Sequence, residues 1–496
     1  MGLTSLPEDV LLDIASFLSV FDLLSLKQTC RALHAFGSSD YLWHNLADQL
    51  ELPLDVPPGI TIKSLSHDEL QQIVIKAIRL EVNWRERTPS AKRITPLVCD
   101  TDEPYVDEMQ FLLGGKWLLT AQRHRQVERR WHSRIVLWSL EDVQDAYRAA
   151  TIELPGAYRS STFELQKGGE SVTLAVGMND GADVIIIYSV DLRDRPEFSY
   201  FAPPAPSPLR RISLPGHPRA PNIRPVIHQL AISEGRIAAT VVVPGGNCSL
   251  QLFVADTRTM FSGWVHPRYF ESFSNLWVRL YEGFLLLLGT MHSRLGTMHS
   301  RLVLRIYNIP TKRRAGMLQP ITDNHSDDED HRFVDLGPVV AEFEQPLRAD
   351  SEIHDISRVS VPSASCLSVM IFYSFHDSSS GIGQVTRFRL PPSAREDNGG
   401  VSGATSYFPM PPHVSAQLAQ VGPGGRAIWL EHNWETQNKR IMRYQPRKGA
   451  RVGLLIPSDP ALPFTPNICH SLAFDEVTGR VCLGLFNGDV YVLDFV

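Results

Sequence analysis

The first 48 residues of the chain crowd several short amphipathic patterns into a segment too small to bury its own apolar surface. Apolar residues recur at helical spacing over 10–18, after a proline and two acidic residues that suit the start of a helix. Further helical patterns follow, over 22–30 with Asp22 as the expected N-cap and over 40–46 with Asp40 as the expected N-cap. We therefore expect these helices to complete their core on a partner protein or, alternatively, on the rest of the chain.

The order of residue types in this segment resembles the F-box, the motif by which substrate receptors dock on the Skp adaptor of SCF-type ubiquitin ligases. The resemblance rests on Leu6-Pro7 before an acidic pair, Ile14-x-x-x-Leu18, Asp22-Leu23-Leu24, Cys30-Arg31 and Leu42-Trp43. It implies that nine residues build or face the adaptor interface: Leu6, Pro7, Val10, Leu11, Ile14, Leu18, Leu23, Leu26 and Trp43. An F-box keeps part of its apolar surface for its partner, so some of these side chains belong to its core. The sequence leaves that division open.

A connecting region follows the F-box-like segment over residues 49–93. Its first part is rich in proline, and the sequence Ser66-His67-Asp68-Glu69 then matches a capping box. Apolar residues continue at helical spacing, which predicts one helix over 67–84 that bridges the F-box to the region after it. We expect Trp84 to anchor this helix.

Helical periodicity ends near residue 94, where short β-rich runs separated by Gly, Asn, Asp and Ser turns begin. The runs form seven groups with hairpins, at a spacing of about 50–60 residues. The predicted pairs are 111–120 with 134–138, 172–176 with 184–188, 230–243 with 249–255, 284–288 with 302–307, 359–375 with 384–390, 427–431 with 440–444, and 472–474 and 480–485 with 489–494. The prediction is a multidomain chain: a small all-α F-box domain over 1–48, then an all-β domain over 94–496 that is a seven-bladed WD-like β-propeller. A pair of β-sandwiches is the alternative.

The last group shows most clearly how such a ring closes. Asn487-Gly488 is a strong hairpin signal, and the strand after it lies at the very end of the chain. We therefore expect the last blade to borrow a strand from around Ile94–Cys99. Ile135–Ser139 resembles the closing strand of a WD-type repeat, although regular Gly-His and Trp-Asp pairs are missing from the rest of the chain.

A proline-rich segment interrupts the repeats, and one hairpin carries a duplicated heptad. The segment 202–221 carries seven prolines, which predicts a loop or linker. The heptad Gly289–Leu295 is repeated at once as Gly296–Leu302, and we interpret the second copy as a seven-residue extension of a hairpin loop.

Composition narrows the function classes. The net charge of −6 argues against a nucleic-acid partner, and the six scattered cysteines argue against a disulfide framework or a zinc site. No apolar run approaches the ~18 residues of a membrane helix, and no signal peptide is visible. Enzyme motifs such as a P-loop or a nucleophile elbow are also missing. We expect a non-catalytic protein of the cytoplasm or nucleus that needs no cofactor or metal and binds no membrane.

One loop of the β region is a candidate for substrate binding. It holds four arginines and a tryptophan between two predicted strands: Arg123, Arg125, Arg129, Arg130 and Trp131. Arginine and tryptophan are favoured at interface hot spots, and arginine grips carboxylates or phosphates. A solvated hairpin tip is the alternative interpretation.

The resemblance therefore implies the substrate-recognition subunit of an SCF-type ligase, with the Skp adaptor as partner and, through it, the cullin and RING subunits. The β domain would hold an unknown protein substrate for ubiquitination. The alternatives are an F-box scaffold that acts without ubiquitination and a propeller hydrolase. The layout also looks similar to F-box proteins of fungi.

Overall fold

The structure is a computed structural model of the whole chain. It describes residues 3, 6–50, 52–57, 60–97, 105–112, 114–123, 132–166, 168–192, 206–244, 249–259, 261–292, 300–309, 333–347, 351–357, 366–373, 381–390, 401–446, 451–456 and 462–496.

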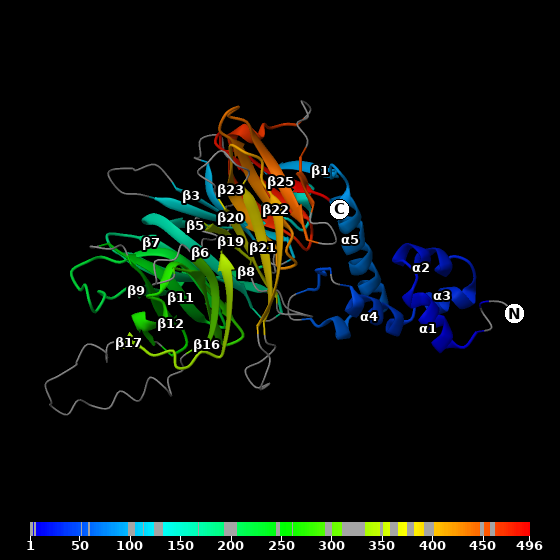
Figure 1. The fold of residues 1–496 in the computed structure, drawn as a ribbon, viewed down its shortest axis with the longest axis horizontal. Helices are drawn as coiled ribbons and strands as arrows, with labels where there is room; N and C mark the ends of the chain where they lie inside the picture. The colour runs from blue at the N-terminus through cyan, green and yellow to red at the C-terminus, as the bar shows by residue number, and fades with distance from the viewer. Residues whose placement is uncertain are drawn as a thin grey trace.

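A small helical domain lies at one side of a large β domain, and one long helix connects the two (Figure 1). The helices are α1 (Glu8–Ser16), α2 (Val20–Lys27), α3 (Arg31–Gly37), α4 (Asp40–Gln49) and α5 (His67–Arg85), with a 3₁₀ turn over Ile62–Ser64 before α5. The capping box predicted before α5 is confirmed, because the Ser66 hydroxyl accepts a bond from the Glu69 N–H and the Glu69 carboxylate accepts one from the Ser66 N–H.

The predicted helix starts within the first domain are wrong by a few residues. Asp22 is not the N-cap of α2, because Ser19 caps it and Asp22 lies at the third helical position, where its carboxylate accepts a bond from the Ser19 N–H. Ser39 rather than Asp40 precedes α4, and Pro7 precedes α1 with extended backbone. The Asp40 carboxylate is used elsewhere, since it accepts a bond from the N–H of His67 at 2.8 Å.

The β domain is a seven-bladed propeller, as predicted. The blades of the first half are β2 (Val106–Phe111), β3 (Trp117–Arg123), β4 (Ser133–Ser139) and β5 (Tyr147–Leu154); β6 (Ala157–Leu165), β7 (Ser171–Asn179), β8 (Asp183–Asp191) and β9 (Pro208–Ser213); and β10 (Val226–Ser233), β11 (Arg236–Val243), β12 (Ser249–Asp256) and β13 (Ser262–Val265), extended by β17 (Phe333–Val334).

The remaining blades follow the same plan of four strands. They are β14 (Phe273–Tyr281), β15 (Phe284–His292), β16 (Ser300–Asn308) and β18 (Ala341–Leu347); β19 (Ser351–Ile356), β20 (Cys366–Tyr373), β21 (Ile382–Arg389) and β22 (Ser402–Pro409); β23 (Val414–Val421), β24 (Ala427–Asn433), β25 (Lys439–Gln445) and β26 (Arg451–Leu454); and β27 (Cys469–Asp475), β28 (Arg480–Leu485), β29 (Val490–Asp494) and β1 (Arg93–Leu97).

The ring closes with a strand from the start of the domain, which confirms the predicted closure. β1 pairs with β29 in antiparallel register, with Thr95 opposite Val492. The last blade therefore contains three strands from the end of the chain and one from before the first blade. Closure of this kind joins distant parts of the chain and leaves β29 with a neighbour on each side.

Two strand predictions and one loop prediction are wrong. The run 111–120 is divided at Gly114 and Gly115, and the run 230–243 is divided at Glu234 and Gly235; all four residues have positive φ, so each run turns into a hairpin. The proline-rich segment 202–221 contains β9, an outer strand that begins at Pro208, where a missing N–H costs no ladder bond.

The duplicated heptads lie at the end of one hairpin. Gly289–His292 of the first copy extends β15, and Ser300–Leu302 of the second copy extends β16, with His292 opposite Ser300. The repeat therefore lengthens both strands, not only the loop between them.

Trp138 belongs to the third strand of its blade, and β5 lies outside it, so it does not close the blade as expected. Its ring is buried, and its indole N–H donates to the Thr120 hydroxyl at 3.1 Å.

We predict that Trp138→Ala lowers the free energy of unfolding by about 3–5 kcal/mol, because it leaves a large cavity. The exposed Trp434→Ala is the control and should change stability by less than about 0.5 kcal/mol. If denaturant unfolding showed equal losses of unfolding free energy for the two variants, Trp138 would not be the core residue described here.

Candidate adaptor-binding face

The helical domain fills its core with side chains from α1 to α4 and from the first half of α5. Three of the nine expected interface residues are buried in it, namely Leu11, Leu23 and Trp43. The indole N–H of Trp43 donates to the carbonyl of Gly37 at 2.8 Å. Leu70 and Val74 of α5 complete this core, so the chain itself covers much of the apolar surface that the short helices cannot bury alone.

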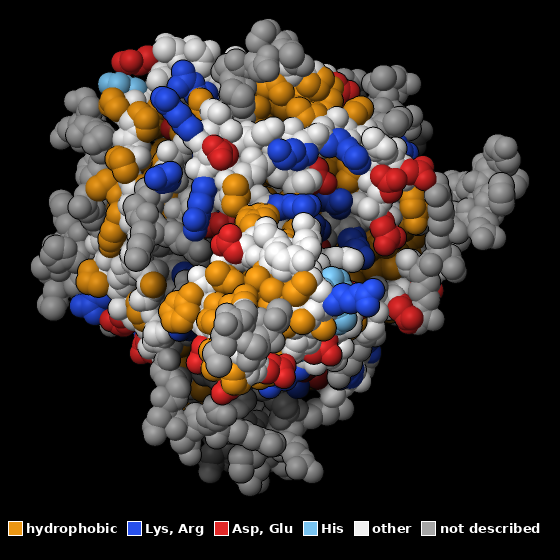
Figure 2. Space-filling model, turned by 90° about the vertical axis from the view of Figure 1, so that its right-hand side faces the viewer, with side chains coloured by type: hydrophobic (Ala, Val, Ile, Leu, Met, Phe, Trp, Pro, Cys, Tyr) orange, Lys and Arg blue, Asp and Glu red, His pale blue; other side chains and the backbone are white. Residues whose placement is uncertain are grey.

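The other expected residues lie toward the surface. Pro7 and Val10 are exposed, whereas Leu6, Ile14, Leu18 and Leu26 are half-buried. Figure 2 views the molecule from this side and shows hydrophobic side chains gathered over the helices nearest the viewer. The structure thus divides the nine residues into a buried set and a set that a partner can reach.

Two exposed aromatic residues were missed by the sequence analysis. Phe17, directly after α1, is 89% exposed, and Phe21 in the first turn of α2 is also exposed. An exposed phenylalanine ring contributes no hydrophobic stabilisation to the folded chain. Several exposed apolar side chains on adjacent helices are typical of a docking surface. The available signal was the pair of phenylalanines on either side of the Ser19 cap. We call Pro7, Val10, Ile14, Phe17 and Phe21 the apolar face.

A basic groove lies between α2, α3 and α5 of the same domain. Its lining residues are Leu24, Lys27, Gln28, Cys30, Arg31, His34 and Gln71. The ammonium group of Lys27 donates to the side-chain carbonyl of Gln71 at 2.8 Å, which ties α2 to α5 across the groove.

Comparison with known proteins identifies this domain. Residues 3–49 match the family described as F-box-like. The N-terminal helices form an F-box-like domain. F-box domains typically bind Skp-type adaptors, and the combination with a propeller suggests a substrate-recognition protein. A search of curated proteins found none that matches the chain.

The second half of α5 belongs to the core of the propeller. Leu80 and Trp84 are buried among side chains of the two last blades. The Trp84 ring stacks on Phe474 at 5.5 Å between centroids and meets Phe495 edge-on at 5.7 Å. The expected anchoring role of Trp84 is confirmed. Because one helix contributes to both cores, the F-box-like domain has a fixed place on the propeller.

A buried ion pair reinforces this junction. The Glu81 carboxylate of α5 binds the guanidinium of Arg426, which precedes β24, and both side chains are almost fully buried. Arg85, one turn further along α5, also binds Glu81, at 2.8 Å. Burial alone would raise the pKa of Glu81, but Arg426 and Arg85 lower it below its usual value, so Glu81 is ionised.

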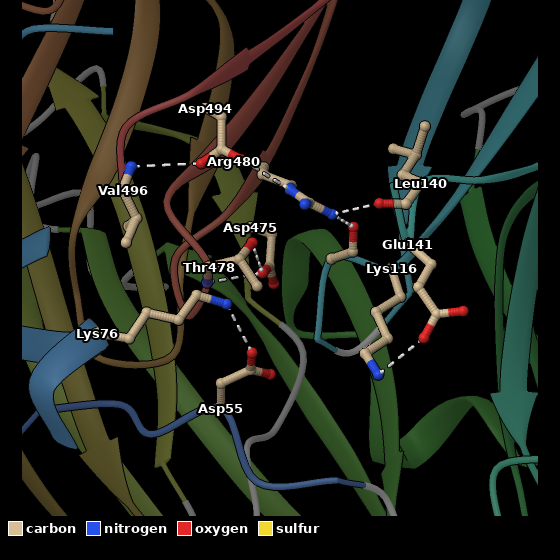
Figure 3. Close-up of polar contacts among 11 residues, drawn as sticks. Asp55, Lys76, Lys116, Leu140, Glu141, Asp475, Thr478, Arg480, Asp494 and Val496 are labelled. Carbon is tan, nitrogen blue, oxygen red and sulfur yellow. Dashed lines mark hydrogen bonds and ion pairs between the residues drawn. The ribbon is translucent and has the colours of Figure 1, made fainter. Parts of the chain in front are cut away.

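The linker before α5 also contacts the propeller end of the junction (Figure 3). Lys76 of α5 binds the carboxylate of Asp55 at 3.0 Å, and Asp55 lies beside the turn at Gly114. Next to this turn, Arg480 donates to the carbonyls of Gly115 and Leu140, each at 2.8 Å, which joins the last blade to the first.

The predicted substrate loop cannot be placed in the same way. Arg125, Arg129, Arg130 and Trp131 lie outside the described residues, and for Arg123 only its backbone at the end of β3 is described.

The helices that the structure describes include none long and apolar enough to cross a membrane. Within the described residues, no group of three or more His, Cys, Asp and Glu side chains could hold a metal ion.

Removing one partner of the buried ion pair tests the junction. We predict that Glu81→Ala lowers the free energy of unfolding by about 3–5 kcal/mol, because it leaves the Arg426 charge buried and unpaired. Glu86→Ala, at an exposed side chain just after the same helix, is the matched control and should be nearly neutral. The double change of Glu81 and Arg426 to alanine should cost less than the sum of the single changes. Additive losses would show that the two groups do not interact.

A buried carboxyl at the junction makes stability depend on pH. Burial raises the pKa of Asp475 to about 6, although Thr478 donates bonds to it and favours the ionised form. Since its ordinary pKa is near 3.8, the folded state binds this proton more tightly than the unfolded state does. Protonation of Asp475 therefore stabilises the fold, and this stabilisation is lost as pH rises through about 6. Asp475→Asn should therefore gain less stability than the wild type when pH falls from about 7 to about 5. Thermal unfolding at both pH values measures the difference, and the exposed Asp13→Asn should behave like the wild type.

Proposed function

We propose that the chain is the substrate-recognition subunit of an SCF-type ubiquitin ligase, which docks on a Skp-type adaptor through the apolar face. The observation that carries this proposal is the 89% exposure of Phe17 on a domain whose own core is already filled by α5. Because Pro7, Val10, Phe17 and Phe21 are exposed, the apolar face is available to another protein.

The propeller would then present a protein substrate. Catalysis belongs to other subunits of the ligase, and this chain supplies proximity by holding a substrate lysine at high effective concentration near the ubiquitin-charged enzyme. The buried junction around Trp84 and Glu81 supports such a role, because a fixed angle between the two domains limits where the substrate can lie. We place this activity in the cytoplasm or nucleus.

The arginine-rich loop that follows Arg123 stays a prediction for substrate contact. If it grips an acidic or phosphorylated segment, reversing the charges of Arg125, Arg129 and Arg130 should abolish substrate capture. Unchanged capture would exclude the loop from substrate contact.

The adaptor contact is tested by co-purification of the full chain with the Skp adaptor. We predict that Phe17→Asp abolishes binding, because a charge replaces an exposed ring of the apolar face and cannot be buried without a partner. Ile14→Asp should do the same, although its side chain is half-buried and the variant also loses some stability.

Val82→Asp is the matched control, since Val82 is an exposed aliphatic residue of α5 outside the apolar face. It should bind the adaptor like the wild type. Binding by a folded Phe17→Asp variant, or no binding by the folded wild type, would contradict the proposal. Recovery of the cullin with the complex distinguishes a ligase subunit from an F-box scaffold.

A further inference from the structure

The innermost strand of every blade has a register shift along its length, which marks a β-bulge. The shifts lie between Val106 and Glu108, Tyr158 and Ser160, Ile227 and Gln229, Phe273 and Asn275, Ile353 and Asp355, Gln417 and Gln420, and Cys469 and Ser471. A bulge redirects a side chain that would otherwise alternate into a sheet face, and bulges are frequent beside binding sites. Near each shift, the side chains of the inner strand therefore do not follow the regular alternation between the two faces of the sheet.

In the last blade, the bulge directs His470 into a cluster of rings at the surface. The His470 ring lies 4.3 Å from Tyr105 and 4.4 Å from Phe486 between centroids, and the latter two rings are 5.6 Å apart. Tyr105 comes directly before β2 of the first blade, whereas Phe486 begins the turn between β28 and β29. Three rings from two blades thus form one continuous surface.

Two further residues border this surface. Ile468 is exposed, and its carbonyl accepts a bond from the N–H of Phe486 at 2.9 Å. The ammonium group of Lys439 lies 6.0 Å from the centre of the Phe486 ring, and its backbone N–H donates to Asn467 at 2.8 Å. We call Tyr105, Lys439, Ile468, His470 and Phe486 the aromatic cluster.

The aromatic cluster lies at the opposite end of the last blade from the F-box-like domain. Leu80 of α5 meets the propeller at Gly479, just before β28, whereas Phe486 follows directly after β28. The six residues of that strand separate the two places by about 20 Å. A molecule bound at the aromatic cluster therefore leaves the apolar face free for the adaptor.

The composition of the aromatic cluster defines what it can bind. Phe486 is 51% exposed, and contiguous exposed rings with a tyrosine are typical of interface hot spots. They favour an apolar side chain that buries the rings. Lys439 forms no ion pair with any acidic residue in the described part of the chain, so a carboxylate beside that apolar side chain would complement its charge.

We propose that the aromatic cluster binds a short acidic segment of the substrate protein, with an apolar side chain packed against Tyr105 and Phe486 and a carboxylate beside Lys439. This inference rests on the proposed receptor function, whose substrate class it specifies. It assigns recognition to a rigid part of the propeller, since the cluster is held by strand ends and by the backbone bonds of Phe486 and Lys439.

The test uses the full-length chain as bait for a randomised twelve-residue peptide library displayed on phage. We expect enriched peptides to combine an aromatic or large aliphatic residue with a neighbouring Asp or Glu. A synthetic peptide of the enriched sequence should bind Phe486→Ala at least tenfold more weakly than the wild type. Tyr407→Ala is the matched control, because Tyr407 is 53% exposed on the outer strand β22 of another blade, and it should bind like the wild type.

Charge reversal distinguishes specific binding of acidic peptides from non-specific hydrophobic binding. Lys439→Glu should lose the acidic peptide and select peptides with Lys or Arg beside the apolar residue. Enrichment of no peptide, of peptides without acidic residues, or of peptides that still bind Phe486→Ala would overturn the inference. Adaptor co-purification is measured separately on the same variants, so peptide binding without adaptor binding would reject the receptor function and leave the aromatic cluster in place.

Discussion

The packing of Trp84 and Leu80 into the last two blades is the contact on which the arrangement of the molecule depends. The same helix carries Leu70 and Val74 in the core of the F-box-like domain, so both hydrophobic cores share one rigid element. The buried pair of Glu81 and Arg426 adds a directional constraint, because a buried ion pair is tolerated only in a geometry that keeps both charges satisfied. Rotation of α5 relative to the last two blades would break that ion pair.

The strand that closes the ring lies next to this contact. β1 begins at Arg93, a few residues after α5 ends, and it completes the blade against which Trp84 packs. The Asn83 side chain reinforces the connection, since it donates to the carbonyl of Phe495 at 2.7 Å and to that of Ser90 at 2.8 Å. The helix, the closing strand and the C-terminus thus lie together (Figure 1), and a change in one of them affects all three.

The sequence predicted those parts of the fold whose signals are local. The capping box at Ser66 and the Asn487-Gly488 turn depend on neighbouring residues, and both lie where predicted. Middle strands such as β8 and β20 are buried on both faces, so they appear as continuous apolar runs. Outer strands are half solvated and lack such runs, which explains why β9 was assigned to a loop.

The candidate sites depend on tertiary contacts and were harder to predict. Whether Leu11 or Phe17 faces water is decided by where α5 packs, and helical spacing alone does not contain that information. Tyr105 is distant in sequence from His470 and Phe486, and it meets them only because the ring closes between the last blade and the first.

Hydrogen exchange of the full-length chain, measured with and without the Skp adaptor, tests the central claim that a fixed F-box-like domain offers one free apolar face. We predict slow exchange over residues 70–84 in both states, and slowing on adaptor binding confined to the backbone around α1 and α2. Fast exchange at residues 80–84 in the free chain, or no slowing in α1 and α2 when the adaptor is bound, would contradict this claim.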